Sequence, residues 1–172
     1  NELCVHFFGE EYDNDGFYAK QGTVNQALLD ELMAHPYIQK AYPKTTGRED
    51  FGKQFTMALI EKWPLDPVDL IATATMFTAQ SITEAVRPFI KGKTELIIGG
   101  GGSYNPTLVT MIKEELPEAR VLIQEEIGFS SEAKEAVAMA ILANQTLQHR
   151  SGNVPNATGA KRAVPLGSIT YY

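Results

Sequence analysis

The segment Thr94–Pro106 constrains the fold more than any other part of the sequence. It opens with an apolar, β-branched run at residues 96–98, which predicts a buried strand of a parallel sheet. Four consecutive glycines at 99–102 predict a tight turn, and Asn105 followed by Pro106 predicts the N-terminus of a helix. A strand, a glycine-rich turn and a helix in this order indicate an α/β fold.

A glycine-rich turn at a helix N-terminus suits a flat or anionic ligand. The missing Cβ atoms allow close approach, and the helix end offers free N–H groups. A Walker A loop is excluded because no Gly-Lys-Ser/Thr follows, and a dinucleotide fingerprint fits poorly because Tyr104 stands at the third glycine position. Either this turn is a nucleotide or sugar site of another type, or it only connects the strand to the helix.

A second strand is predicted over residues 119–124, after a helix that Pro117 terminates. Strand, helix and strand form a βαβ unit, which requires parallel strands and a right-handed crossover. Ligands of such sheets bind beyond the carboxyl ends of the strands. We therefore expect Gly99–Gly102 and Glu125–Gly128 at one functional edge.

Two helices are predicted near the start of the sequence. Residues 2–8 are apolar and mixed, and Gly9 stops the helix that they form. Thr23 and Gln26 match a capping box, with Thr at the N-cap and Gln three residues on. The apolar spacing that follows predicts a helix to about His35.

A helix over residues 51–62 precedes the longest predicted helix. Asp66 as N-cap and Pro67 at the first helical position start the longer one. Its apolar face extends to Phe89 and Ile90 and is interpreted as a core stripe rather than a cofactor site.

A last long helix is expected to begin at Ser130 or Ser131. The tail then contains a turn-rich loop at 152–159 and an edge strand at 169–172. The inward-facing residues of the last helix are predicted to be Ala133, Ala136, Val137, Ala140, Ile141 and Leu147.

The segment Glu11–Gly16 resembles the first half of a calcium-binding loop. Such a loop needs a bidentate glutamate at its twelfth position, where this sequence has Gly22. Calcium binding is therefore excluded, and we expect a solvated acidic turn. The histidines are scattered along the chain, so no catalytic or metal-binding constellation is visible.

Two further places carry candidate binding residues. Lys44, Thr46 and Arg48 lie in the polar loop 43–50, where cations and hydroxyls suit phosphate or sugar hydroxyls, although a solvated loop explains them as well. Glu135 in the last helix is expected within reach of the functional edge. A helical glutamate is also a common solvated surface residue.

Charge and composition exclude several classes. The 172 residues carry a net charge of −6 without a cluster of Lys or Arg, which argues against a nucleic-acid partner. No apolar run reaches the roughly eighteen residues of a membrane span. Cys4 is the only cysteine, which excludes a disulfide framework and suits a cytoplasmic protein. The start at Asn1, without an initiator methionine, leads us to expect a processed, trimmed or partial chain.

Several segments, taken in order, resemble one family, the anhydro-N-acetylmuramic acid kinases of the sugar kinase/actin/Hsp70 superfamily. Their order and spacing agree along nearly the whole chain. The matching segments are Tyr12–Gly16, Pro43–Glu49, Gly100–Gly102 with Asn105–Pro106, Glu135–Ala136, Gly152–Pro155, Thr158–Ala160 and Leu166–Gly167.

The resemblance implies an ATP-dependent enzyme that opens the 1,6-anhydro ring of the sugar and phosphorylates O6 in cell-wall recycling. Residues 1–172 would be a single domain, the ribonuclease H-like C-terminal lobe of an actin/hexokinase-like ATPase fold. ATP would bind with Mg²⁺. The resemblance places the adenosine half at Gly100, Gly101, Gly102 and Asn105. It places the sugar substrate near Glu135, with Lys44, Thr46 and Arg48 lining the cleft.

The resemblance also implies parts that this sequence does not contain. The family's Asp-x-Gly-Pro-x-Asn segment, whose aspartate is the expected general base, and its phosphate-binding loop lie upstream of the matching region. No catalytic residue or metal ligand is therefore assigned here, and the chain alone is expected to be inactive. A non-catalytic nucleotide- or sugar-binding module and a kinase for a different sugar are the alternatives. The sequence does not fix the oligomeric state, and a homodimer is compatible with it.

Overall fold

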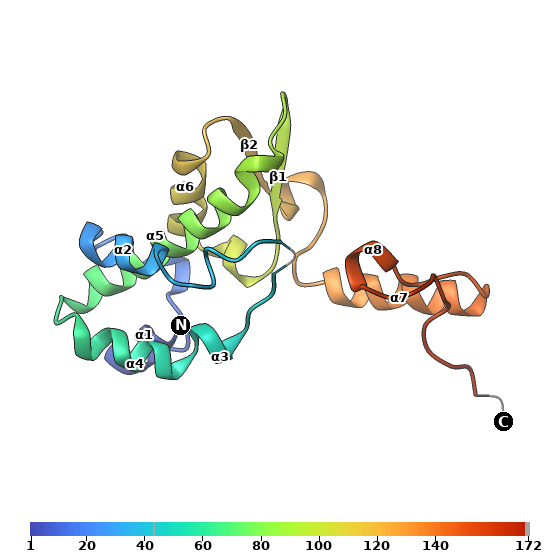
Figure 1. The fold of residues 1–172 in the computed structure, drawn as a ribbon, viewed down its shortest axis with the longest axis horizontal. Helices are drawn as coiled ribbons and strands as arrows, with labels where there is room; N and C mark the ends of the chain where they lie inside the picture. Colours follow the sequence, from blue (N-terminus) through green and yellow to red (C-terminus); the bar gives the residue numbers. More distant parts are fainter. Residues whose placement is uncertain (43, 171–172) are drawn as a thin grey trace. The chain divides into compact units, whose positions relative to one another are not determined.

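The computed structural model describes residues 1–42 and 44–170 of the chain (Figure 1). It divides into two compact units, Asn1–Ile123 and Gln124–Tyr172, which are described separately. None of the helices within the described residues is long and apolar enough to cross a membrane.

The first helices of unit 1 agree with the sequence except at one cap. Helix α1 (Glu2–Phe8) ends at Gly9, whose φ of 71° gives it the left-handed conformation that glycine favours. Helix α2 (Gln26–Met33) is capped by Asn25, whose side chain accepts the N–H of Leu28 at 3.0 Å. The predicted capping box is wrong because Thr23 lies outside the helix.

The middle of unit 1 contains a split helix and the longest helix. The helix predicted over residues 51–62 appears as α3 (Arg48–Phe51) and α4 (Lys53–Lys62), separated by the extended Gly52. Helix α5 (Pro67–Val86) begins as predicted, because the Asp66 side chain accepts the N–H of Val68 at 3.0 Å.

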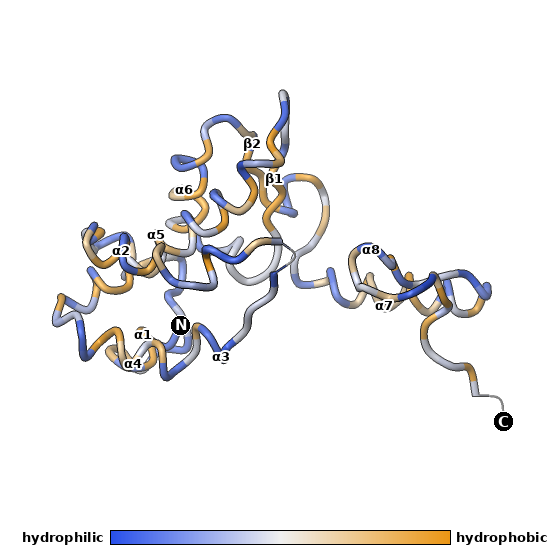
Figure 2. Tube along the Cα trace, in the orientation of Figure 1, coloured by the Kyte–Doolittle hydropathy of each residue, from blue (hydrophilic) through white to orange (hydrophobic). Residues whose placement is uncertain are grey.

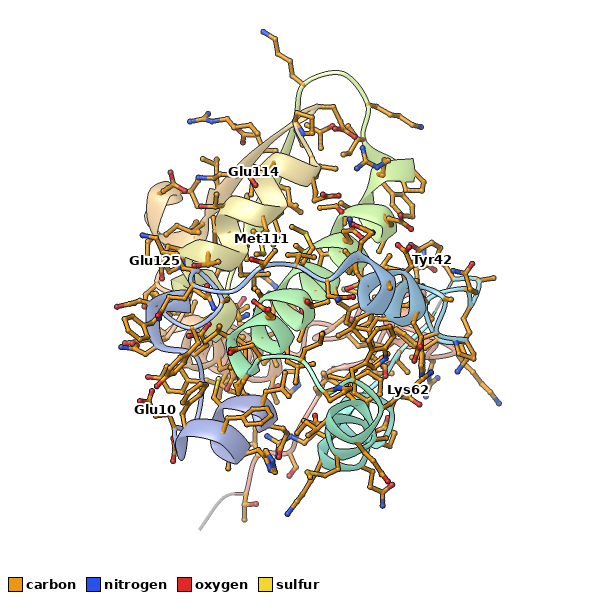
Figure 3. All side chains as sticks on the ribbon, turned by 90° about the vertical axis from the view of Figure 1, so that its left-hand side faces the viewer. Glu10, Tyr42, Lys62, Met111, Glu114 and Glu125 are labelled. Carbon is orange, nitrogen blue, oxygen red and sulfur yellow. The ribbon has the colours of Figure 1, made fainter. Side chains whose placement is uncertain are left out.

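Helix α5 ends earlier than predicted. A 3₁₀ turn, η2 (Arg87–Phe89), follows it, and Pro88 lacks the N–H that would continue the helix. The Phe89 side chain is 65% exposed, so its predicted inward position is wrong. It contacts the edge of Tyr42, whose hydroxyl donates to the Ala85 carbonyl at 2.8 Å (Tyr42 is labelled in Figure 3).

The predicted βαβ unit is confirmed. Strands β1 (Thr94–Ile98) and β2 (Ala119–Ile123) pair in parallel, with Ile98 opposite Ile123, and α6 (Pro106–Glu115) connects them. The prediction that β1 is fully buried is wrong, because burial alternates along it and Ile97 is 45% exposed. In the part of the chain that the structure describes, the sheet has these two strands.

Two hydrophobic clusters stabilise unit 1, and α5 contributes to both (Figures 1 and 2). One cluster joins the N-terminal half of α5 to α1, α2 and α4. The other joins its C-terminal half to α6 and the sheet, and Met111 of α6 packs against it (Figure 3). Side chains such as Leu28, Leu70 and Ile112 are at most 1% exposed, and each contributes roughly 2 kcal/mol by burial.

Unit 2 contains the 3₁₀ turn η4 (Gln124–Ile127), helix α7 (Lys134–Leu147) and the short helix α8 (Pro155–Thr158). The prediction that α7 faces inward is wrong, because none of its residues is buried and Leu147 is 65% exposed. Among the described residues of unit 2, short segments around Gly152 and at 166–170 lie beside α7, and they leave most of the helix exposed.

The tail differs from its prediction in two places. Helix α8 replaces part of the turn-rich loop predicted at 152–159. No strand forms at Ile169 and Thr170, and the remaining two residues of that prediction, Tyr171 and Tyr172, lie outside the described residues.

Candidate functional site

A cavity of about 630 Å³ lies beside the glycine turn in unit 1. Four segments line it: the N-terminal part of α1, the turn at residues 12–15, the middle of α5, and the glycine turn with the start of α6. The lining residues are Asn1, Leu3, Cys4, Tyr12, Asp13, Asn14, Asp15, Ile71, Ala74, Thr75, Thr78, Gly101, Gly102, Tyr104, Asn105 and Leu108. A cavity of this size is typical of small-molecule sites.

The glycine turn leaves open space at the cavity wall. Gly100 has a φ of 99°, a conformation that side chains rarely adopt, and the 3₁₀ turn η3 (Gly101–Tyr104) follows it. The Ser103 hydroxyl donates to the Gly100 carbonyl at 2.8 Å and stabilises the turn. A Cβ placed on Gly101 would meet no protein atom within 4 Å. A ligand can therefore approach the backbone of the turn closely.

Asn105 and Pro106 begin α6 as predicted. The Asn105 side-chain oxygen accepts the N–H of Leu108 at 2.9 Å and caps the helix. The side-chain amide N–H groups of Asn105 are donors that it can offer to a ligand. The residue thus has a structural role and also lines the cavity.

The acidic turn is solvated at most of its side chains, as predicted, while its backbone is held in place by contacts of Asp13 and Gly16. The Asp13 carboxylate accepts the N–H groups of Tyr18 and Ala19 at 2.8 and 3.0 Å. Gly16 is buried, and its carbonyl accepts the Thr107 hydroxyl at 3.0 Å. These contacts hold the turn, η1 (Asn14–Gly16), against α6 and place Tyr12, Asn14 and Asp15 on the cavity wall.

Helix α5 contributes to the cavity as well as to the core. Thr75 and Thr78 line the cavity, and their hydroxyls donate to the carbonyls of Ile71 and Ala74 at 2.8 and 3.0 Å. With their protons engaged, these hydroxyls can only accept hydrogen bonds from a ligand. The helical spacing of the sequence predicts a core stripe here, and it misses the contribution of α5 to the cavity.

Cys4 lies at the apolar side of the cavity and is 1% exposed. Burial is the largest cause that raises the pKa of its thiol above the usual value. The thiol is therefore protonated at neutral pH and behaves as a small apolar side chain.

Lys44, Thr46 and Arg48 do not line this cavity. The Lys44 ammonium donates to the Ile38 carbonyl at 2.7 Å and lies 5.2 Å from the ring centroid of Tyr37. The Thr46 hydroxyl donates to a carboxylate at 2.7 Å, and Arg48 is the exposed first residue of α3. Their sugar-binding role stays a prediction.

Glu135 belongs to unit 2, where it lies in the first turn of α7 with an exposed side chain. An acidic residue in the first turn also interacts favourably with the helix dipole. Its role at the sugar stays a prediction. Among the residues that the structure describes, no three His, Cys, Asp or Glu side chains are grouped so that they could hold a metal ion.

The fold and the cavity define a class, an α/β protein in which a glycine turn and a helix N-terminus border a small-molecule site. The sequence profile described as anhydro-N-acetylmuramic acid kinase matches residues 1–172. The chain belongs to this family, which confirms the resemblance found in the sequence.

Curated relatives agree with the family match. A Clostridioides difficile (strain 630) protein named anhydro-N-acetylmuramic acid kinase is 47% identical over 172 residues, which cover 98% of this chain and 45% of the relative. A protein of the same name from Bacillus cereus (strain AH187) is 46% identical and covers 99% of this chain and 46% of the relative. The chain therefore spans slightly less than half the length of the curated relatives that it matches.

Proposed function

We propose that the complete polypeptide containing this chain is an ATP-dependent kinase that opens the 1,6-anhydro ring of anhydro-N-acetylmuramic acid and phosphorylates O6. The family match along all 172 residues carries this proposal. Residues 1–172 would form the ribonuclease H-like C-terminal lobe of an actin/hexokinase-like fold. The small parallel sheet with its glycine turn supports this assignment.

The cavity beside the glycine turn is the proposed site of the adenosine half of ATP. Gly101 leaves room for a planar group against the backbone, and Gly102 and the Asn105 amide lie at the same wall. Glu135 is the proposed sugar contact, with Lys44, Thr46 and Arg48 in the cleft. We further propose a cytoplasmic enzyme, since ATP is available there and the lone Cys4 stays reduced.

The remaining machinery is proposed to lie in the part of the relatives that this chain does not cover. Phosphoryl transfer depends on positioning the two reactants and on neutralising the charge of the phosphates, which Mg²⁺ bound to ATP would supply. We assign the protein ligands of that ion, the general base and the phosphate loop to that part, because the family's aspartate segment and phosphate-binding loop lie upstream of the matching region. The chain alone is expected to be inactive.

The decisive experiment measures ADP release by the complete native polypeptide with Mg·ATP and the anhydro sugar. We expect release that depends on the sugar, together with a 6-phosphate product in the mass spectrum. A well-folded polypeptide that binds ATP in a calorimeter but releases no ADP would overturn the kinase proposal in favour of a binding module. Release with another anhydro sugar only would overturn the proposed substrate.

A further inference from the structure

We propose that the turn formed by residues 12–16 is a second binding wall for the nucleoside half of the nucleotide, with Asp15 as its hydrogen-bond acceptor and Thr107 as its positioning residue. This inference rests on the proposed function, because it takes ATP as the ligand of the cavity. In this arrangement Asp15 provides a polar side-chain contact, whereas Gly101 provides backbone atoms beside open space.

The position of the turn is fixed by a tight contact with α6. A Cβ added to Gly16 would overlap the Thr107 hydroxyl and the Asn105 side-chain oxygen, so only glycine allows this approach. The Gly16 carbonyl accepts both the Thr107 hydroxyl at 3.0 Å and the N–H of Lys20 at 2.9 Å. The turn is thus attached to the same helix end that carries the glycine turn.

The two carboxylates of the turn have different roles. Asp13 uses both of its oxygens on the N–H groups of Tyr18 and Ala19, so it holds the turn together. Asp15 lines the cavity with an exposed side chain, and in the described part of the chain its carboxylate makes no hydrogen bond or ion pair. Its φ of 54° is uncommon for a residue with a side chain, a feature that clusters at functional positions.

The negative charge of the cavity lining favours the nucleoside half of a nucleotide over the triphosphate at this wall. Asp13 and Asp15 line the cavity, and among its described lining residues none is Lys or Arg. A triphosphate there would face like charges in a partly desolvated space, which is unfavourable. Ribose hydroxyls and exocyclic amino groups, by contrast, donate to carboxylates, and ribose binding by an acidic side chain is an established solution in other nucleotide-binding folds.

Aromatic rings favour the same orientation. Tyr12 and Tyr104 both line the cavity, with 54% and 43% of their surfaces exposed. Exposed rings beside a glycine turn provide flat apolar area for a base. The cavity therefore binds the uncharged nucleoside, with the phosphates outside it.

The Asp15 carboxylate can be removed by substitutions that tolerate the positive φ at this position, which makes a direct test feasible. Asp15→Gly deletes the carboxylate and suits the positive φ, whereas Asp15→Asn keeps a neutral acceptor and also tolerates this conformation. We expect Asp15→Gly to raise the KM for ATP about tenfold at constant kcat, with a smaller rise for Asp15→Asn. Glu11→Gln, an exposed acidic position outside the cavity, is the charge control.

Three nucleotides identify the group that Asp15 binds: ATP, 2′-deoxy-ATP and ITP, which lacks the exocyclic amino group. The wild type should use ATP better than one of the analogues, and Asp15→Gly should bring that ratio close to one. Loss of discrimination against 2′-deoxy-ATP identifies the ribose, and loss against ITP identifies the amino group. Unchanged ratios for both analogues would overturn the role of Asp15.

Thr107 is tested separately from Asp15. Thr107→Val keeps the shape of the side chain but removes the hydroxyl that holds Gly16, and Thr107→Ser should restore it. We expect the valine variant to raise the KM for ATP about threefold to tenfold with kcat unchanged. Thr110→Val on the exposed side of the same helix is the control. In an Asp15→Gly background the effect of Thr107→Val on the KM should vanish, because Thr107 acts on nucleotide binding by positioning the turn that carries Asp15.

The outcomes separate this inference from the proposed function. If the wild type releases no ADP with the sugar, the kinase proposal fails, and calorimetric titration with the same nucleotides still tests the turn. If the wild type is active while Asp15→Gly and Thr107→Val bind ATP with wild-type affinity, the kinase stands and the second wall is overturned.

Discussion

Gly101 provides a residue-level test of the proposed nucleotide site. No protein atom lies within 4 Å of a Cβ built on it, so a larger side chain would enter the cavity rather than the core. We predict that Gly101→Val raises the KM for ATP in the complete enzyme by about tenfold, roughly 1.4 kcal/mol of binding, while the unfolding temperature changes little. Gly101→Ala should give a smaller effect, and unchanged nucleotide kinetics in both variants would contradict the assignment.

Substitution of Gly16 tests the packing of the acidic turn against α6. Alanine at this position would adopt a φ of 66° and overlap the Thr107 hydroxyl, whereas alanine at Gly9 would adopt a φ of 71° in open space. We predict a loss of about 1 kcal/mol for Gly9→Ala and of at least about 3 kcal/mol for Gly16→Ala, measured by denaturant unfolding. Equal losses would show that the backbone conformation alone sets the requirement for glycine.

At the scale of elements, the N-terminus of α2 tests the corrected cap. Asn25 accepts the Leu28 N–H with its side chain, whereas Thr23 contributes only its backbone N–H, which donates to Asp69 at 2.7 Å. We predict that Asn25→Ala lowers the free energy of unfolding by about 1 kcal/mol and that Thr23→Ala changes it by less than about 0.5 kcal/mol. The reverse order would restore the capping box that the sequence suggests.

Elements with strong local signals could be predicted from the sequence, and those that depend on distant contacts could not. Asp66 and Asn105 act as helix caps within three residues of their partners, and the sequence pattern identifies both. The contact between Gly16 and Thr107 joins residues 91 positions apart, so no local pattern reveals that the turn lines the cavity. The glycine turn, like the caps, is visible in the sequence because its residues are adjacent.

At the scale of the whole molecule, Glu135 tests whether the two units bind different substrates. It lies in unit 2, whereas the proposed nucleotide cavity lies entirely in unit 1. We predict that Glu135→Gln lowers kcat or raises the KM for the sugar by about tenfold or more, because a charge-assisted hydrogen bond becomes a neutral one. The KM for ATP should stay within about twofold, and an equal effect on both substrates would contradict the sugar assignment.

Helix α5 connects ligand binding to stability. Among its cavity-lining residues, Ile71 belongs to the first core cluster and Ala74 packs against it, while Thr75 and Thr78 flank Met76, which packs against the second. A ligand held there contacts a helix that contributes to both core clusters, so its binding energy adds to the stability of unit 1. At a hundred times its Kd, such a ligand would stabilise the native state by about 2.7 kcal/mol. Melting temperature can therefore serve as a screening signal for nucleosides and their analogues, without sugar substrate or catalytic turnover.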